Sequence, residues 1–421
     1  MSKASNITKP KLSLLEFAAM MAYMISLVAL SIDAMLPVLD LVGRDYDVTD
    51  SNQTQLVIIM LFLGLTIGQL IYGPVSDSVG RKPAIFAGLG LFIFGCLLTM
   101  VAQNFWVMLF GRLLQGLGVA GPRIVSMAVV RDIYVGREMA KVASFIMSFF
   151  IIVPAVAPLL GQWVADEWSW RAIYFVLLAM AVLVSVWYGL RQPETLRPEY
   201  RRTLSLGGVL SKFYEALTVR ITFGYSFAAG IVYGSFLAYL MTSPQLFEDV
   251  FGITDKFPYY FGALAICIGS ASFVNARLVM KLGMRKLCTW ALLAKAIWAA
   301  VFFVSAVMLN RSGGTLPLVA FMIWAGFSFF LLGILFGNVN AIAMEPVGHI
   351  AGVGSAVVGS VSGFVSLGIG TIIGQSYAGT VLPLIGGFAI LAPISLLVMK
   401  WADDGNELLE GHVHRVANES D

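Results

Sequence analysis

The strongest constraint on this chain is a series of apolar segments, twelve in all, each long enough to cross a lipid bilayer. The 421 residues are 59% hydrophobic and only 12% charged, with a mean hydropathy of +0.86, whereas soluble domains carry about 25% charged residues. Because lipid offers no hydrogen bonds to the backbone, segments of this length predict helices, and the chain is predicted to be an all-α membrane protein. The predicted spans are residues 14–37, 54–75, 83–102, 105–130, 140–164, 171–190, 219–241, 257–280, 287–309, 316–339, 352–376 and 379–400.

The distribution of basic residues between successive loops predicts the orientation of these spans. The first span carries Asp33 and lacks a small-residue cleavage site, so it is read as an uncleaved helix. Basic residues gather in alternate loops, which predicts cytoplasmic N- and C-termini in an inner membrane. The net charge of +3 is therefore a topology signal and not a nucleic-acid surface. The predicted cytoplasmic side holds Lys3, Lys9, Lys11, Arg81, Lys82, Arg131, Arg137, Lys141, the run 191–220, Arg277, Lys281, Arg285, Lys286, Lys400 and Arg415, and the other side holds Arg44, Arg171, Lys256 and Arg311.

One long polar stretch, residues 191–220, divides the spans into six and six. The predicted organisation is an N-terminal bundle (1–190), a cytoplasmic linker (191–218) with a surface helix near 204–217, a C-terminal bundle (219–400) and a cytoplasmic tail (401–421). A faint repeat supports two related bundles, because residues 73–82 (GPVSDSVGRK) after the second span correspond to residues 276–286 (ARLVMKLGMRK) after the eighth. The fold predicted is twelve transmembrane helices in two pseudo-symmetric six-helix bundles.

Two arginines lie inside the fourth span, where a charge costs several kcal/mol or more on insertion scales. Arg112 and Arg123 are eleven residues apart, so they leave one helical face about 16 Å apart, with Gln115 on the same face. Such a face must meet water, a ligand or a carboxylate. The alternative is that both arginines are structural, bonding to carbonyls or reaching the membrane surfaces.

Asp33 in the first span is the sharpest candidate for a functional site. An ionised carboxylate in an apolar helix is costly unless it is paired, and we predict Arg112 as its partner. Protonation of Asp33 would release Arg112 to a new partner, so the two protonation states would favour different arrangements of the bundle. The alternative is a permanent pair that only joins helices one and four.

Five motifs carry a resemblance to a known family. They are residues 73–83 (GPVSDSVGRKP), 31–37 (SIDAMLP), 111–116 (GRLLQG), 153–161 (VPAVAPLLG) and 243–252 (SPQLFEDVFG). The chain resembles the major facilitator superfamily, and within it the twelve-helix drug:proton antiporters of the bicyclomycin/chloramphenicol resistance (Bcr/CflA) type.

The resemblance implies a secondary transporter that exports a drug or metabolite by alternating access, driven by a proton gradient and without a cofactor. It implies that Asp33 is protonated during the cycle. A cytoplasmic gate is also predicted, in which Asp77 faces the positive end of a helix and Arg81 bridges to Asp132. The resemblance identifies that helix as the eleventh, beginning near Gly352 or Gly354. The alternative is that Arg81 and Lys82 only set the topology. The gate set is Gly73, Asp77, Gly80, Arg81 and Asp132, and Pro154 and Pro158 are the predicted hinge of helix five.

The cargo remains open between two classes. Apart from Asp33, the predicted cavity is cationic, which favours an anionic or zwitterionic cargo such as a carboxylate metabolite or siderophore, with proton symport as an alternative, over a lipophilic cation. A neutral antibiotic is the competing cargo. The predicted substrate-binding set is Asp33, Arg112, Gln115, Arg123, Asn338 and Asn340, while Gln55, Gln69 and Gln375 either line the cavity or bond between helices.

A third class, a non-transporting membrane sensor or enzyme, finds no support in the sequence. There is no appended domain, no Ser/His/Asp set and no metal-ligand spacing, and Cys96, Cys267 and Cys288 suggest no disulfide. The chain is predicted not to be an enzyme and to bind no metal. Its expected partners are a small-molecule substrate, protons and the lipid bilayer, and it is expected to work as a monomer.

Overall fold

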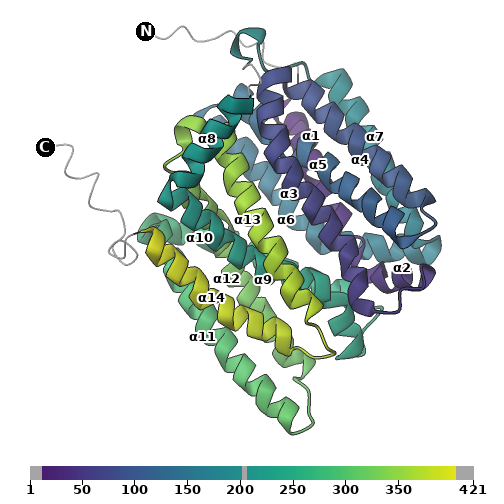
Figure 1. The fold of residues 1–421 in the computed structure, drawn as a ribbon. Coiled ribbons are helices and arrows are strands. Elements are labelled where there is room, and N and C mark those ends of the chain that lie inside the picture. The colour runs from purple at the N-terminus through teal and green to yellow at the C-terminus, as the bar shows by residue number, and fades with distance from the viewer. Residues whose placement is uncertain (1–11, 202–205, 404–421) are drawn as a thin grey trace, which may run out of the picture.

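The computed structural model describes residues 12–201 and 206–403, and every regular element in these ranges is a helix (Figure 1). Short elements lie between the long helices: η1 (Leu36–Val38), α2 (Leu39–Asp45), η2 (Ser51–Gln55), η3 (Pro198–Tyr200), α8 (Leu206–Thr218) and η4 (Gly348–Ile350). The long helices are α1 (Leu14–Asp33), α3 (Leu56–Val79), α4 (Arg81–Val101), α5 (Phe105–Ile133), α6 (Gly136–Glu167), α7 (Trp170–Arg191), α9 (Arg220–Asp249), α10 (Phe257–Leu282), α11 (Met284–Arg311), α12 (Leu318–Met344), α13 (Ala351–Gln375) and α14 (Leu382–Ala402).

Eleven helical segments of the described chain are long and apolar enough to cross a membrane. The remaining long helix, α6, spans 32 residues and packs against α1, α7 and α10. The predicted all-α membrane fold is thus confirmed. The N-terminal lysines, Arg415 and the predicted tail beyond residue 403 lie outside the described residues.

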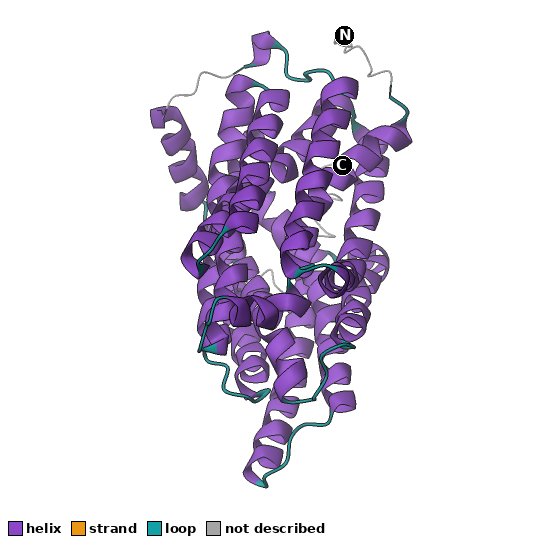
Figure 2. Cartoon of the chain, turned by 90° about the vertical axis from the view of Figure 1, so that its right-hand side faces the viewer, coloured by secondary structure: helices purple, strands orange, loops and turns teal. Residues whose placement is uncertain are grey.

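The long helices form two groups that follow the chain. Helices α1 to α7 pack mainly on one another, and so do α9 to α14, which are drawn in purple to blue and in teal to yellow in Figure 1. The groups meet chiefly where α3 packs on α13 and where α6 packs on α10. Figure 2 shows the long helices running from one end of the molecule to the other, with the connecting loops at the two ends.

Two ends of the molecule need names. The terminal side carries the start of α1, the end of α14, and the turns at Gly80 and Gly283; the far side carries α2, η2 and the α13–α14 loop. On the far side a single buried apolar cluster joins both groups, whereas the terminal half of the second group has a separate cluster of its own. The buried apolar contact between the two halves is therefore most continuous on the far side.

One proline follows the end of a long helix, whereas others lie within helices that continue through them. Helix α1 ends at Asp33, four residues before Pro37, because a proline ring clashes with the carbonyl four positions earlier. Helices α6 and α9 instead continue through Pro154, Pro158 and Pro244. A hinge at Pro154 and Pro158 stays a prediction. The continuation of α9 to Asp249 carries polar side chains beyond the predicted span.

Candidate functional site

Arg112 is fully buried, and its hydrogen bonds join its own helix α5 to α1 and α3, while Gln115 extends the network to α4. Its guanidinium donates to the carbonyl of Ser31 in α1 at 2.9 Å, to the carbonyl of Val57 in α3 at 3.1 Å and to Oε1 of Gln115 at 2.8 Å. Gln115 in turn donates to Thr99 of α4 at 2.9 Å. These contacts match the structural alternative for Arg112, in which it bonds to carbonyls.

The predicted ion pair between Asp33 and Arg112 is absent from this conformation. Ser31 turns its carbonyl to Arg112, and Asp33, two residues later, leaves the helix about 200° around from it. The pairing prediction was wrong for this state because a helical period places a residue on a face without naming the neighbour of that face.

Asp33 lies instead against the second half of the molecule. Asp33 is only 5% exposed, and its side chain forms no hydrogen bond or ion pair among the described residues. It interacts electrostatically with Tyr239 of α9. A carboxyl group at the end of α1 thus sits at the interface that must change if the halves move against each other.

Arg123 also faces across this interface, further toward the terminal side. It interacts electrostatically with Tyr233 of α9, and no carboxylate among the described residues pairs with it. The Tyr233 hydroxyl donates to the Phe336 carbonyl at 3.0 Å and accepts a hydrogen bond from the Asn340 amide. The structure therefore brings two predicted substrate-binding residues, Arg123 and Asn340, to one tyrosine.

Aromatic rings connect the surroundings of Arg123 to those of Asp33. Tyr233 packs edge-on to Phe336 with ring centroids 4.7 Å apart, and Phe236 contacts both Phe336 and Phe329. Phe329 then packs on Tyr239 at 4.7 Å. This wall of α9 and α12 rings lies between the two charged positions.

The other predicted polar residues lie elsewhere. Asn338 is buried and donates to Asn275 of α10 at 2.6 Å, so it bonds within the second half. Gln115 lies in the Arg112 network. Lys295 is buried within the second half, where its amine donates to Ser235 at 3.0 Å and lies over the Phe388 ring.

The predicted gate residues meet on the terminal side. Arg81 donates to Asp132 of α5 at 2.9 Å and also bonds to Asp77. Asp77 lies against the first turn of α13, where a Cβ on Gly352 would be 3.0 Å from its carboxylate. Gly80 joins α3 to α4 at a φ of +114°, which favours glycine. The gating role of this cluster remains a prediction.

Sequence reasoning missed part of this network. Glu194 accepts the backbone N–H groups of Arg81 and Lys82, each at 2.9 Å, at the start of α4, where a carboxylate also faces the positive end of the helix. It stands in the PETLRPE segment, whose acidic residue just after a span was the available signal.

The second half carries a counterpart of this cluster, as the faint repeat suggested. Gly283 has a φ of +76° between α10 and α11, and Arg285 pairs with Glu345 at 3.0 Å and with Asp403 at 3.3 Å. Asp403 also accepts from Tyr225. Neither acid was predicted as a partner, because both come from segments distant in the chain.

On the far side, uncharged amides join the halves. Gln55 donates to Gln245 of α9 at 2.8 Å and to the Gly374 carbonyl of α13 at 3.1 Å. Gln375 donates to the Asn52 carbonyl at 2.9 Å, and Asn52 donates to the Tyr377 carbonyl at 3.0 Å. We call Asn52, Gln55, Gln245 and Gln375 the far-side amide cluster. Gln55 and Gln375 thus bond between helices, one of the two roles predicted for them.

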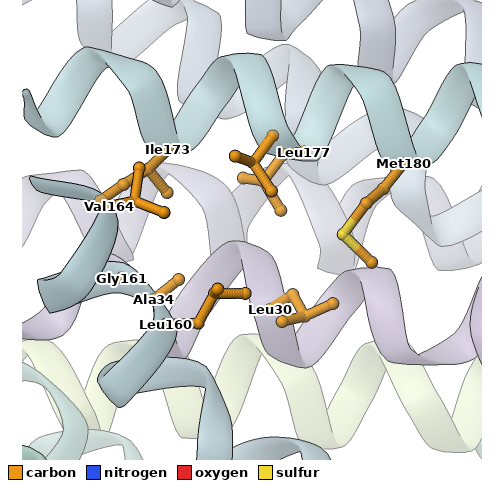
Figure 3. Close-up of a pocket in the computed structure, with 9 residues that line it drawn as sticks. Leu30, Ala34, Leu160, Gly161, Val164, Ile173, Leu177 and Met180 are labelled. Atoms are coloured by element: carbon orange, nitrogen blue, oxygen red, sulfur yellow. The ribbon is translucent and has the colours of Figure 1, made fainter. Parts of the chain in front are cut away.

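Two hollows differ in what they can hold. The pocket in Figure 3 lies between α1, α6 and α7, is lined by apolar side chains such as Leu30, Leu177 and Met180, and measures about 10 Å³, the space of one water at most. A cleft of about 300 Å³ on the terminal side lies between α3, α5 and the start of α13. Its lining includes Asp77, Arg81, Asp132 and Ile124, the residue after Arg123.

Comparison with known proteins agrees with this architecture. Residues 12–371 match the family model described as Major Facilitator Superfamily. The chain is 30% identical to an uncharacterized MFS-type transporter, YdgK, of Bacillus subtilis (78% of this chain, 81% of the relative). It is 28% identical to a bicyclomycin resistance protein homolog of Haemophilus influenzae (87% and 90%) and 27% identical to the multidrug resistance protein MdtL of Citrobacter koseri (78% and 80%). The chain belongs to the major facilitator superfamily of membrane transporters.

Proposed function

We propose that this transporter exports a small molecule across the inner membrane by alternating access, in exchange for protons that Asp33 binds and releases. Export is supported by the similarity to relatives whose names refer to bicyclomycin and multidrug resistance. The terminal side faces the cytoplasm, since Arg44, Arg171, Lys256 and Arg311 are the basic residues of the far side and the other side has many more. A single chain holds both halves and is proposed to work alone.

The observation that carries proton coupling is the setting of Asp33. A carboxylate without an ion pair, buried at the interface between the halves, is costly in its ionised form. This conformation therefore suits the protonated side chain. Deprotonation would require water or a cation, and Arg112, with guanidinium bonds to neutral acceptors only, is the proposed partner in the other state. The proton thereby selects between two arrangements.

The test measures proton movement on addition of substrate. In everted vesicles with an imposed inside-acid pH gradient, a transported compound such as bicyclomycin is expected to release protons from the lumen, reported by a pH-sensitive dye. Asp33→Asn is expected to abolish this release, because an amide cannot exchange a proton, and Asp33→Glu is expected to keep part of it.

The matched control is Asp166→Asn, which neutralises an exposed acid at the end of α6 on the far side. It is expected to behave as the unchanged protein. Uphill transport by Asp33→Asn under the same gradient would show that Asp33 is not the coupling group, and proton movement in the same direction as the cargo would replace antiport by symport.

A further inference from the structure

The guanidinium of Arg123 forms no hydrogen bond or ion pair with the described residues, and its one resolved electrostatic neighbour is Tyr233. Several other described arginines form ion pairs with carboxylates, among them Arg44, Arg81, Arg171, Arg191 and Arg285. Arg112 satisfies its guanidinium with two carbonyls and an amide. Arg123, within the same membrane-spanning helix as Arg112, has neither arrangement, although its position in α5 makes an uncompensated charge expensive.

The neighbours of Arg123 leave its donors available. Tyr233 donates its proton to the Phe336 carbonyl, and Asn340 uses its amide N–H groups on Tyr233 and on the same carbonyl. The Asn340 side-chain oxygen takes part in no hydrogen bond among the described residues. Arg123 thus has free donors near Tyr233, the tyrosine to which Asn340 also bonds. A planar guanidinium matches an oxyanion with two parallel hydrogen bonds.

The aromatic wall supplies the apolar part of a binding site. Tyr233, Phe236 and Phe336 are only partly covered, and α9, which carries the first two, packs on α12, α13 and α14 as a central helix of its half. Small-molecule sites combine such aromatic linings with a few placed polar groups. The single cation selects one negative charge, and the rings select an apolar or aromatic body.

We propose that Arg123 binds the carboxylate of a transported organic monoanion whose apolar or aromatic body packs on Tyr233, Phe236 and Phe336. This assignment rests on the proposed transport function, because it names the cargo of the same interface. Arg123 lies on α5 of the first half and the rings lie on α9 and α12 of the second, so a bound carboxylate bridges the two halves. Arg123 directly precedes Ile124, which lines the terminal-side cleft, and this cleft offers the anion a route of entry.

The test compares two ligands that differ only in charge. Calorimetric titration of the purified full-length protein in phosphatidylcholine nanodiscs uses 2-naphthoate and the neutral 2-naphthamide. The unchanged protein is expected to bind naphthoate at least about tenfold more tightly, the scale of one charge-assisted pair. Arg123→Gln is expected to remove this preference by weakening naphthoate alone, and Arg123→Lys to retain part of it.

The control variant Arg311→Gln removes an exposed positive charge at the far-side end of α11 and is expected to leave both affinities unchanged. Naphthamide binding reports that the Arg123→Gln protein is folded. Equal binding of the two ligands by the unchanged protein, or a preference that survives Arg123→Gln, overturns the assignment. A preference lost when phosphatidylglycerol is added to the nanodiscs overturns it too, since a lipid headgroup is then the anion.

The binding test and the transport test can fail independently of each other. The binding preference needs no pH gradient, so it persists if Asp33→Asn vesicles still transport uphill. Conversely, proton-coupled transport with equal affinity for naphthoate and naphthamide leaves the coupling proposal standing and removes only the carboxylate site.

Discussion

At the scale of single residues, buried charge is handled in three ways. Arg81 is paired with two carboxylates, Arg112 bonds only to neutral acceptors, and Asp33 is unpaired at the interface between the halves. Burial of a charge is tolerated when hydrogen bonds or a counter-charge replace water. The first two arrangements stabilise one conformation, whereas the unpaired carboxyl group is the one that we propose to couple the conformation to a proton.

A double-mutant cycle tests whether Asp33 and Arg112 act on each other in this state. Arg112→Met leaves two carbonyls and an amide without their donor, so we expect a loss of about 2–4 kcal/mol in the free energy of unfolding. Asp33→Asn is expected to change the free energy of unfolding only slightly. The coupling energy between the two substitutions is expected to lie below about 0.5 kcal/mol, as for residues without a shared interaction. Chemical denaturation in detergent measures all three variants. A coupling above about 1 kcal/mol would show that the pair forms in the dominant state.

At the scale of elements, the contact of α3 with α13 runs along nearly their whole length. Gln55, directly before α3, meets Gly374 near one end, Thr66 meets Gly363 in the middle, and Asp77 meets Gly352 at the other end. Glycine allows this approach because a Cβ on Gly363 would be 2.7 Å from the Thr66 side chain. Small residues at helix contacts are the usual means of close packing in a membrane.

Gly363→Val is therefore expected to separate α3 from α13 and to cost about 1–3 kcal/mol in stability through overpacking. Thermal unfolding followed by a thiol-reactive dye measures the loss, since Cys96 and Cys288 are buried in the folded protein. The matched control is Gly90→Val in α4, where a Cβ meets nothing within 4 Å. Equal stability of the two variants would contradict the close contact.

At the scale of the whole molecule, the two ends are held by different chemistry. The terminal side carries charged clusters around Arg81 and Arg285, whose ion pairs each lie within one half, and on the far side the amide cluster around Gln55 bonds across the halves. Arg81 and Arg285 are both buried, so salt screens their ion pairs less than exposed ones, and the amide hydrogen bonds carry no net charge to be screened. The balance between the ends is what alternating access must shift.

Gln55→Leu is expected to favour a state open on the far side, because it leaves Gln245 and the Gly374 carbonyl without their donor. Loss of two hydrogen bonds of about 1 kcal/mol each corresponds to a population shift of roughly tenfold or more. Thr49 and Ala378 are exposed residues of the two halves on this side. Spin labels at these two positions report the distance between the halves by pulsed electron paramagnetic resonance. An unchanged distance distribution would show that the amide cluster does not hold the far side closed.

Much of the fold follows from local properties of the sequence. Hydropathy located the long helices, and the polar stretch after residue 190 separated α7 from α9. The paired Gly80–Arg81 and Gly283–Arg285 turns were visible as a repeat because positive φ and buried basic residues restrict the sequence locally. The pair of Arg81 with Asp132 was predicted from the position of Asp132 at the cytoplasmic end of the fourth span, and the two side chains lie 2.9 Å apart.

The sequence by itself determined that Asp33, Arg112 and Arg123 would lie in membrane-spanning helices, because hydropathy locates the spans that carry them. Tertiary structure alone decided what they meet on other helices: the Ser31 and Val57 carbonyls for Arg112, the surroundings of Tyr239 for Asp33 and those of Tyr233 for Arg123. A helical period specifies the direction in which a side chain leaves its helix. Which distant helix meets that direction is settled only by how the twelve helices pack.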